Sequence, residues 1–183
     1  PSSHGRNALI SNNRREEMTF DDFCNNVETW SEARGIYAHS TALAQALKAV
    51  SEVGELADAV IKGDEAALID AIGDVAVCIV NVAKMAELPV DHLYKYREEV
   101  EGAQTYSTTA EACASVANRV GGLALNAAGR CESHDAVDAL CALLDMCDTE
   151  QLLFTSCCEA AWDEIKDRKG RMVPGGAFVK EGV

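Results

Sequence analysis

The sequence is poor in aromatic residues and in proline, and both shortages favour packed helices over sheets. Aromatic side chains make up 5% of the 183 residues, so alanine, valine and leucine must supply the core. Small side chains let helix backbones approach closely, whereas strands favour β-branched and aromatic residues. The three prolines are Pro1, Pro89 and Pro174, so no helix breaker stands between the last two. We therefore expect an all-α fold.

Long apolar runs and a leader sequence are also missing. No apolar run approaches the roughly 20 residues that a helix needs to cross a bilayer. Residues 1–15 lack the apolar core of a signal peptide. These absences predict a cytoplasmic protein without a membrane partner, with residues 1–18 as a flexible N-terminal segment.

Cysteine is frequent, yet the patterns of disulfide and zinc sites are absent. The eight cysteines include no Cys-x-x-Cys pair, and none of the four histidines lies at ligand spacing from a cysteine. Disulfide frameworks are typical of short secreted chains. We expect most of these cysteines to be small core residues.

Positive charge is scarce outside the end of the chain. The net charge is −14, from 30 acidic and 16 basic residues, which argues against a nucleic-acid partner. The C-terminal end is the exception, with Lys166, Arg168, Lys169, Arg171 and Lys180. An acidic body with a basic tail over residues 171–183 suits a metal ion on the body and phosphate on the tail. The alternative is a solvated terminus.

Apolar periodicity, capping residues and glycines predict about seven helices. Thr19 is a good cap for the first helix, and Gly35, Gly63 and Pro89 end the first three helices. The predicted helices cover residues 19–35, 41–61, 65–87, 91–102, 109–128, 133–146 and 149–169. Residues 102–108 are the predicted linker between two sets of helices.

The second set of helices echoes the first. The run Val-Gly-Glu-Leu-Ala at 53–57 matches Val-Gly-Gly-Leu-Ala at 120–124, and Asp74 aligns with Asp138. We interpret this as a degenerate tandem duplication, with a catalytic repeat over residues 19–102 and a second repeat over 108–170 that completes the bundle. Chance similarity between alanine-rich helices is the alternative.

Polar residues follow one arc of helix 41–61 and one stripe of helix 65–87. On the first lie Gln45, Lys48, Glu52 and Glu55, because residues three and four apart share a helix face. The opposite face is apolar and is expected to pack inward: Leu43, Leu47, Val50, Val53, Val60 and Ile61. The second helix is apolar all round and must be buried, with three polar residues in line on it: Asp70, Asp74 and Asn81.

The stripes predict a divalent metal site if they face each other. Glu52, Glu55, Asp70 and Asp74 would then converge, and like charges so close are costly unless a cation neutralises them. An oxygen-only ligand set favours Mg²⁺ or Mn²⁺. A solvated polar face is the alternative. A di-iron bundle would need Glu-x-x-His on two helices, and neither Glu52 nor Glu55 has a histidine three residues on.

These residues carry a family resemblance. The pattern Gln45-x-x-Lys48-x-x-x-Glu52-x-x-Glu55-Leu56, followed by Ile72-Gly73-Asp74-Val75, resembles the all-α nucleoside triphosphate pyrophosphohydrolases of the MazG type. The small phage-type members are similar further along, at Trp30-x-x-x-Arg34-Gly35-Ile36, Glu164-Ile165-x-x-Arg168-Lys169-Gly170-Arg171-Met172 and Gly176-x-Phe178-Val179-Lys180. Their second acidic element is usually Glu-x-x-Asp, whereas this chain has Ala71, and we expect Asp70 to take over.

The resemblance implies a MazG-like helical bundle that hydrolyses a (deoxy)nucleoside triphosphate to the monophosphate and pyrophosphate, controlling the dNTP pool in the host cytoplasm if phage-encoded. It implies two or more Mg²⁺ or Mn²⁺ ions per site, held by Glu52, Glu55, Asp70 and Asp74, with Glu52 or Glu55 orienting the attacking water. The expected substrate-binding residues are Gln45, Lys48, Asn81, Arg168, Lys169 and Arg171, with Trp30, Tyr37 and His39 at the base. A purine dNTP, dGTP or dATP, is preferred because alanine- and glycine-rich neighbours leave room for it.

The second repeat predicts one active site per chain, because Arg119, Gly122 and His134 stand opposite Glu52, Glu55 and Asp70, and the resemblance implies a homo-oligomer. MazG-type relatives pair identical chains, and here the second repeat would replace the partner through buried apolar residues: Val120, Leu123, Val137, Leu140, Leu143 and Leu144. A dimer or tetramer of such fused chains is expected. The alternatives are an inactive nucleotide-binding or antitoxin-like interaction protein of the same fold, and a phosphoribosyl-ATP pyrophosphatase.

Overall fold

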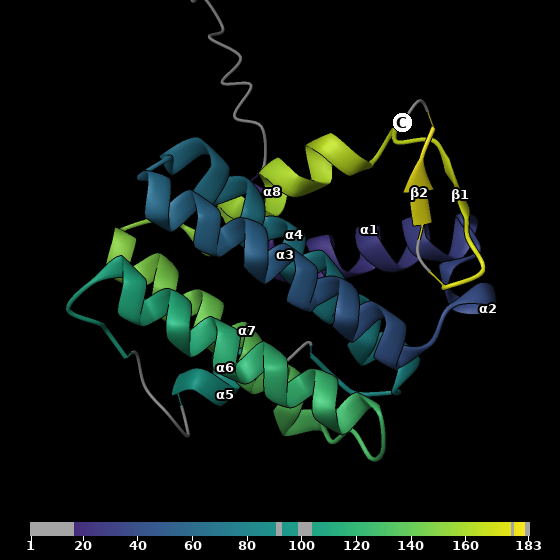
Figure 1. Ribbon diagram of the computed structural model, residues 1–183, viewed down its shortest axis with the longest axis horizontal. Coiled ribbons are helices and arrows are strands. Elements are labelled where there is room, and N and C mark those ends of the chain that lie inside the picture. Colours follow the sequence, from purple (N-terminus) through teal and green to yellow (C-terminus); the bar gives the residue numbers. More distant parts are fainter. Residues whose placement is uncertain (1–16, 91–92, 99–103, 177, 182–183) are drawn as a thin grey trace, which may run out of the picture.

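The computed structural model describes residues 17–90, 93–98, 104–176 and 178–181, and within them the chain is mainly helical (Figure 1). The helices are α1 (Phe20–Ala33), α2 (Ile36–His39), α3 (Ala42–Lys62), α4 (Glu65–Met85), α5 (Leu93–Tyr96), α6 (Thr109–Ala127), α7 (Ser133–Glu150) and α8 (Phe154–Ile165). The strands are β1 (Gly170–Met172) and β2 (Phe178–Lys180). The all-α prediction is confirmed, with eight helices in these ranges where about seven were expected.

Local signals position the α3–α4 hairpin. The Thr41 hydroxyl accepts a hydrogen bond from the Ala44 amide at 3.1 Å, and the Asp64 carboxylate accepts one from the Ala67 amide at 3.1 Å. Gly63 ends α3 with a φ of 65°, in the left-handed region that glycine tolerates. Because both helix starts and the turn between them are specified locally, the two helices lie antiparallel side by side.

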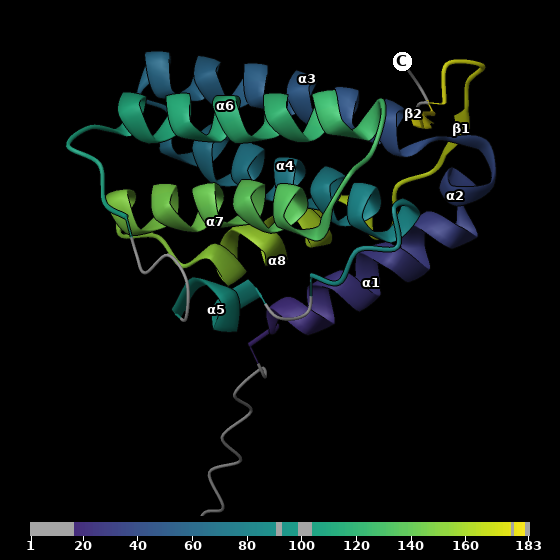
Figure 2. The same ribbon diagram turned by 90° about the horizontal axis from the view of Figure 1, so that it is seen from below.

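The helices α3, α4, α6 and α7 form a four-helix bundle, and α1 and α8 cover α4 on its other side (Figure 2). Helix α4 contacts α1, α3, α7 and α8, so it is buried along most of its length. By length and composition α4 is apolar enough to cross a membrane, contrary to the expectation that no such run exists. Most of that stretch is buried among the other helices, which accounts for its composition.

The second half of the chain packs against the first half, in the place that a partner chain would otherwise take. Helix α6 lies beside α3, and α7 lies beside α4. The six apolar residues predicted for this role are all buried: Val120, Leu123, Val137, Leu140, Leu143 and Leu144. The bundle therefore closes within one chain, while the duplication and its residue limits stay a prediction.

One face of α3 differs from the expectation. Leu47, Val50 and Ile61 were predicted to pack inward, but their side chains are exposed, Ile61 by 82%. Helix α3 instead packs through smaller residues, Ala46 and Ala49 among them, because α4 and α6 both approach that side. Three of the six residues of the predicted apolar face thus lie on an outer surface of the bundle, whereas Val53 is buried as expected.

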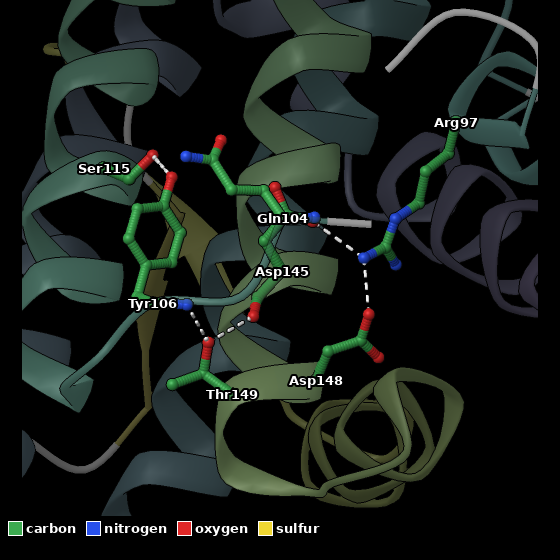
Figure 3. A network of polar contacts seen from close by, with 7 residues as sticks. All are labelled: Arg97, Gln104, Tyr106, Ser115, Asp145, Asp148 and Thr149. Carbon is green, nitrogen blue, oxygen red and sulfur yellow. Dashed lines mark hydrogen bonds and ion pairs between the residues drawn. The ribbon is translucent and has the colours of Figure 1, made fainter. Parts of the chain in front are cut away.

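A polar network ties the residues that follow α5 to α7. Of the helix predicted over residues 91–102, the described residues 93–98 are helical. Arg97 donates to the Asp145 carboxylate at 2.7 Å and to Asp148 at 2.5 Å, while the Gln104 amide donates to Asp145 at 3.0 Å. Figure 3 shows the seven residues of this network: Arg97, Gln104, Tyr106, Ser115, Asp145, Asp148 and Thr149. Residues 91–92 and 99–103 of the predicted helix, like residues 1–16 of the predicted N-terminal segment, lie outside the described ranges.

The chain ends in a β-hairpin that the sequence analysis missed. The strands β1 and β2 are antiparallel, with Arg171 opposite Val179 and Met172 opposite Phe178. Gly170 lies so close to the Val179 carbonyl oxygen and the Phe178 ring that a side chain would clash there. Each strand has three residues, too few for an alternating pattern to be recognised.

Candidate active site

A pocket opens between α1, α3, α4, the end of α8 and β2; we call it the main pocket. Seven of the predicted site residues line it: Trp30, Gln45, Lys48, Glu52, Asp74, Asn81 and Arg168. Ile36, Val77, Cys78, Ile165 and Phe178 complete the wall. The space between these atoms, open mouth included, is about 550 Å³. The main pocket therefore combines charged, amide and apolar groups from segments far apart in the sequence.

The predicted carboxylates divide between two adjacent hollows. Glu52, 5% exposed, and Asp74 line the main pocket. Glu55 is exposed and lines a second hollow with Asp70 and Ala71, which we call the side hollow. Among the described residues, no group of three or more His, Cys, Asp and Glu side chains is arranged to hold a metal ion as it stands. The four carboxylates were expected to converge on a single point. They instead form a band along α3 and α4, which we call the carboxylate band.

Burial and mutual repulsion make this band electrostatically unfavourable. Burial, together with the charges of Glu52, Asp70 and Glu164, raises the pKa of Asp74 to about 7, against the opposing effect of Arg168. Burial and the contact with Glu164 also raise the pKa of Asp70. The charges therefore interact across both hollows, and an added cation would relieve them.

Three basic side chains of the described residues lie near the carboxylates: Lys48, Arg168 and Lys62, the last of which lines the side hollow and pairs with Asp58 at 3.0 Å. Lys48 forms an ion pair with Glu52 one turn later on α3. Arg168, just beyond α8, forms an ion pair with Glu164. The Nε atom of Arg168 is buried and has no hydrogen-bond partner in the described part of the chain. The main pocket thus holds a guanidinium whose hydrogen bonds are incompletely satisfied.

A fixed polar network forms the back of the main pocket. The Asn81 side-chain oxygen accepts hydrogen bonds from the Ser31 hydroxyl at 2.7 Å and the Tyr37 hydroxyl at 2.9 Å. Gln45 donates to the Ser40 hydroxyl at 2.9 Å. Because its oxygen is held, the amide of Asn81 keeps one orientation. Sequence reasoning missed Ser31, which is a small buried residue without a distinguishing pattern.

Helix α1 holds the end of α8 against the main pocket. The Trp30 indole N–H donates to the Ile165 carbonyl at 2.7 Å, and its ring meets Phe178 edge-on, with ring centroids 5.5 Å apart. Arg34 donates from Nη2 to the carbonyl oxygens of Lys166, at 3.1 Å, and Arg168, at 2.9 Å. No role was predicted for Arg34 or Phe178, although both stand in the quoted motifs. The spacing of Trp30 and Arg34 on one helix face was the available signal.

Four residues predicted to bind substrate do not line the main pocket. Tyr37 stands behind Asn81, through which it contributes a hydrogen bond. His39, Lys169 and Arg171 are exposed, and none of them lies on the pocket wall. Lys169 and Arg171 flank Gly170 where the chain enters the hairpin, so their side chains follow the strand and not the helix.

Comparison with protein families gives a match that coincides with this geometry. Residues 40–92 match the family model of the MazG nucleotide pyrophosphohydrolase domain, over less than a third of the chain. The matched segment contains α3 and α4, and so Lys48, Glu52, Asp74 and Asn81 of the main pocket. Comparison with curated proteins and with solved structures gives no match. The match and the helical fold confirm the family resemblance and support nucleotide pyrophosphohydrolase activity in general terms.

Proposed function

Because residues 40–92 match the family model of the MazG nucleotide pyrophosphohydrolase domain, we propose that the protein hydrolyses a (deoxy)nucleoside triphosphate to the monophosphate and pyrophosphate. Water adds to the α-phosphorus, and the bond to the bridging oxygen breaks, so that pyrophosphate leaves. One observation carries the proposal: Glu52 and Asp74 share the main pocket with Lys48 and Arg168. Carboxylates that can bind a metal ion and basic side chains that can bind phosphate thus lie in the same pocket.

A divalent metal fits this site by the chemistry of its donors. The band offers only carboxylate oxygens, which suit Mg²⁺ and Mn²⁺. Burial, and then the crowding of the carboxylates, raises the pKa of Asp74, as expected where a cation belongs. We assign Glu52 and Asp74 to the metal from the main pocket, and Glu55 and Asp70 from the side hollow, with two or more ions per site. When bound, the metal neutralises the triphosphate and lowers the pKa of a bound water.

The remaining pocket residues bind and orient the nucleotide. Lys48 and Arg168 bind phosphate oxygens, for which an arginine fork is well suited. Of the two candidates for orienting the water, Glu52 is the better placed, because it is buried in the main pocket and Glu55 is exposed. Gln45 and Asn81 bind the sugar or a phosphate, and Trp30 contacts the base. Lys169 and Arg171 contribute only through the long-range field of their charges, and His39, which is exposed, makes no contact on the pocket wall.

Each chain has one such site. In the second half, Asp138 aligns with Asp74 but forms an ion pair with Arg119 at 2.9 Å. The aligned second half keeps only this one of the four carboxylates, with Arg119, Gly122 and His134 at the other three positions, and a single carboxylate beside an arginine does not neutralise a divalent ion. The second half therefore acts by completing the bundle.

An apolar outer surface, which we call the α3–α6 face, supports the proposal of a homo-oligomer. Its large exposed residues are Leu47, Val50 and Ile61 of α3 and Leu125 of α6, the last exposed by 75%. These helices lie side by side. Gly54 near the middle of α3 and Gly121 and Gly122 in α6 add no side chains to the surface. In a chain of net charge −14, this apolar patch, where Asp58 is paired with Lys62, is where two copies can approach. We propose that two chains pair there, and that pairs associate further if a tetramer forms.

Pyrophosphate release from a panel of dNTPs with Mg²⁺ or Mn²⁺ tests the proposed reaction and the preference for dGTP or dATP. Asp74→Asn should lower turnover by several orders of magnitude. The matched control is Asp138→Asn, which should retain activity. An inactive wild-type protein that binds nucleotide would favour the interaction-protein alternative, and hydrolysis of phosphoribosyl-ATP alone would favour the sister enzyme. Control of the dNTP pool and a cytoplasmic setting, in a host cell if the gene is carried by a phage, are part of the proposal.

A further inference from the structure

We propose that Glu164, on the last turn of α8, is an additional carboxylate ligand of the metal site. It would join the band from the side opposite α3. The inference rests on the metal-dependent hydrolysis proposed above and adds a ligand from outside the matched domain, 90 positions beyond Asp74 in the sequence.

The packing of α8 on α4 puts Glu164 over the acidic stripe. The two helices touch at Gly73, where a side chain would lie 2.5 Å from the Ala161 methyl carbon and still closer to the Cys157 carbonyl oxygen. Gly73 is the neighbour of Asp74, and Glu164 is three residues after Ala161, on the same side of α8. The absence of a side chain at Gly73 therefore brings the α8 carboxylate into reach of α4.

The contacts of Glu164 agree with this placement. Its carboxylate lies near enough to those of Asp70 and Asp74 to contribute, after burial, to the raised pKa of both. Carboxylates so close repel one another unless a proton or a cation lies between them. The only basic group that the described contacts place on Glu164 is Arg168, because Lys166 pairs with Asp163 at 2.6 Å. The carboxylates near Asp70 thus outnumber the available cations, as in an oxygen-ligand metal site.

The ion pair of Glu164 with Arg168 links this ligand to nucleotide binding. Arg168 lines the main pocket, its Nε atom has no partner within the described residues, and Arg34 holds its backbone carbonyl. When Glu164 turns toward a metal, the guanidinium is released while its backbone stays in place. Arg168 is then free to bind a phosphate of the substrate.

The test measures metal binding without nucleotide. Mn²⁺ binding to the full chain is measured by titration calorimetry for wild type, Glu164→Gln, Glu164→Asp and the control Glu159→Gln, which changes another face of α8. We expect both Glu164 variants to weaken Mn²⁺ binding by roughly tenfold or more, and Glu159→Gln to match wild type. Glu164→Asp keeps the charge but shortens the reach, so it separates a ligand from a distant charge. Circular dichroism in EDTA verifies the fold.

Failure of this inference differs from failure of the proposed function. If wild type binds Mn²⁺ and releases pyrophosphate while both Glu164 variants bind Mn²⁺ like Glu159→Gln, Glu164 is not a ligand. If only Glu164→Gln is weakened and Glu164→Asp is unchanged, Glu164 acts by charge alone, and the inference is likewise overturned. If wild type neither binds Mn²⁺ nor hydrolyses any dNTP, the proposed function itself is wrong and the inference goes with it.

Discussion

Asp74→Asn should make the metal-free protein more stable at pH 8 while abolishing its activity. Burial and neighbouring carboxylates raise the pKa of Asp74 from 3.8 to about 7. A carboxyl group whose pKa is raised on folding destabilises the folded state wherever it must ionise, with the full penalty above the folded pKa and none below the unfolded pKa. Asparagine has the same shape and no charge to bury, so it removes the penalty.

The size of this effect follows from the shift. At about 1.4 kcal/mol for each pKa unit, the upper limit is about 4 kcal/mol. Asp74 is only partly buried, and solvent screening reduces the expected gain to about 2 kcal/mol. For a chain of this length, such a gain raises the melting temperature by roughly 4–8 °C.

Scanning calorimetry in EDTA at pH 8 and pH 5 measures the effect. At pH 5 Asp74 is mostly protonated in the folded state, so the gain should fall to roughly a third of its value at pH 8. The control is Asp58→Asn, which removes an exposed ion pair with Lys62 at 3.0 Å and should change the melting temperature little at either pH. A variant no more stable than wild type at pH 8, or equally stabilised at both pH values, would refute the electrostatic reasoning.

Three further predictions concern the helix crossing, the tail and the outer face. Gly73→Ala should lower the free energy of unfolding in urea by more than about 2 kcal/mol, because its methyl group meets the Cys157 carbonyl; a neutral substitution would show that α8 is free to shift. Arg168→Ala should raise the KM for the triphosphate by about tenfold or more, and Arg171→Ala far less, because only Arg168 lines the main pocket; equal effects in steady-state assays would contradict this distinction. Leu47→Glu should shift the protein toward a monomer in light scattering, and an unchanged mass would remove the α3–α6 face as an interface.

Local sequence patterns were sufficient to predict α3 and α4, the two helices that carry most of the site. Thr41, Gly63 and Asp64 mark the ends of α3 and α4 because their caps involve neighbours within four residues. The spacing of Glu52 on α3 and of Asp74 on α4 was sufficient to predict two polar stripes, and the structure places both residues in the main pocket. The family resemblance, read from the same residues, is confirmed by the matched domain.

Boundaries at the end of the chain were harder to predict. The last two helices were expected over residues 133–146 and 149–169, whereas α7 continues to Glu150 and α8 ends at Ile165. Gln151 ends α7 with a φ of 59°, a conformation that sequence reasoning assigns to glycine first. Beyond α8, the hairpin gains its stability from Trp30 and from the start of α3, which no local pattern reveals.

The sequence by itself determined an all-α chain, two acidic stripes and a MazG-type segment, because periodicity and spacing are properties of single helices. Only the tertiary structure decided which face meets which. It placed Glu55 in a different hollow from Glu52, left Leu47 on the surface and brought Glu164 near Asp70. A helix fixes which side chains share a face, but the partner of that face depends on packing with segments far away in the chain. Gly73 illustrates this dependence, because α8 packs closely on α4 at this residue and no side-chain pattern at Gly73 indicates the contact.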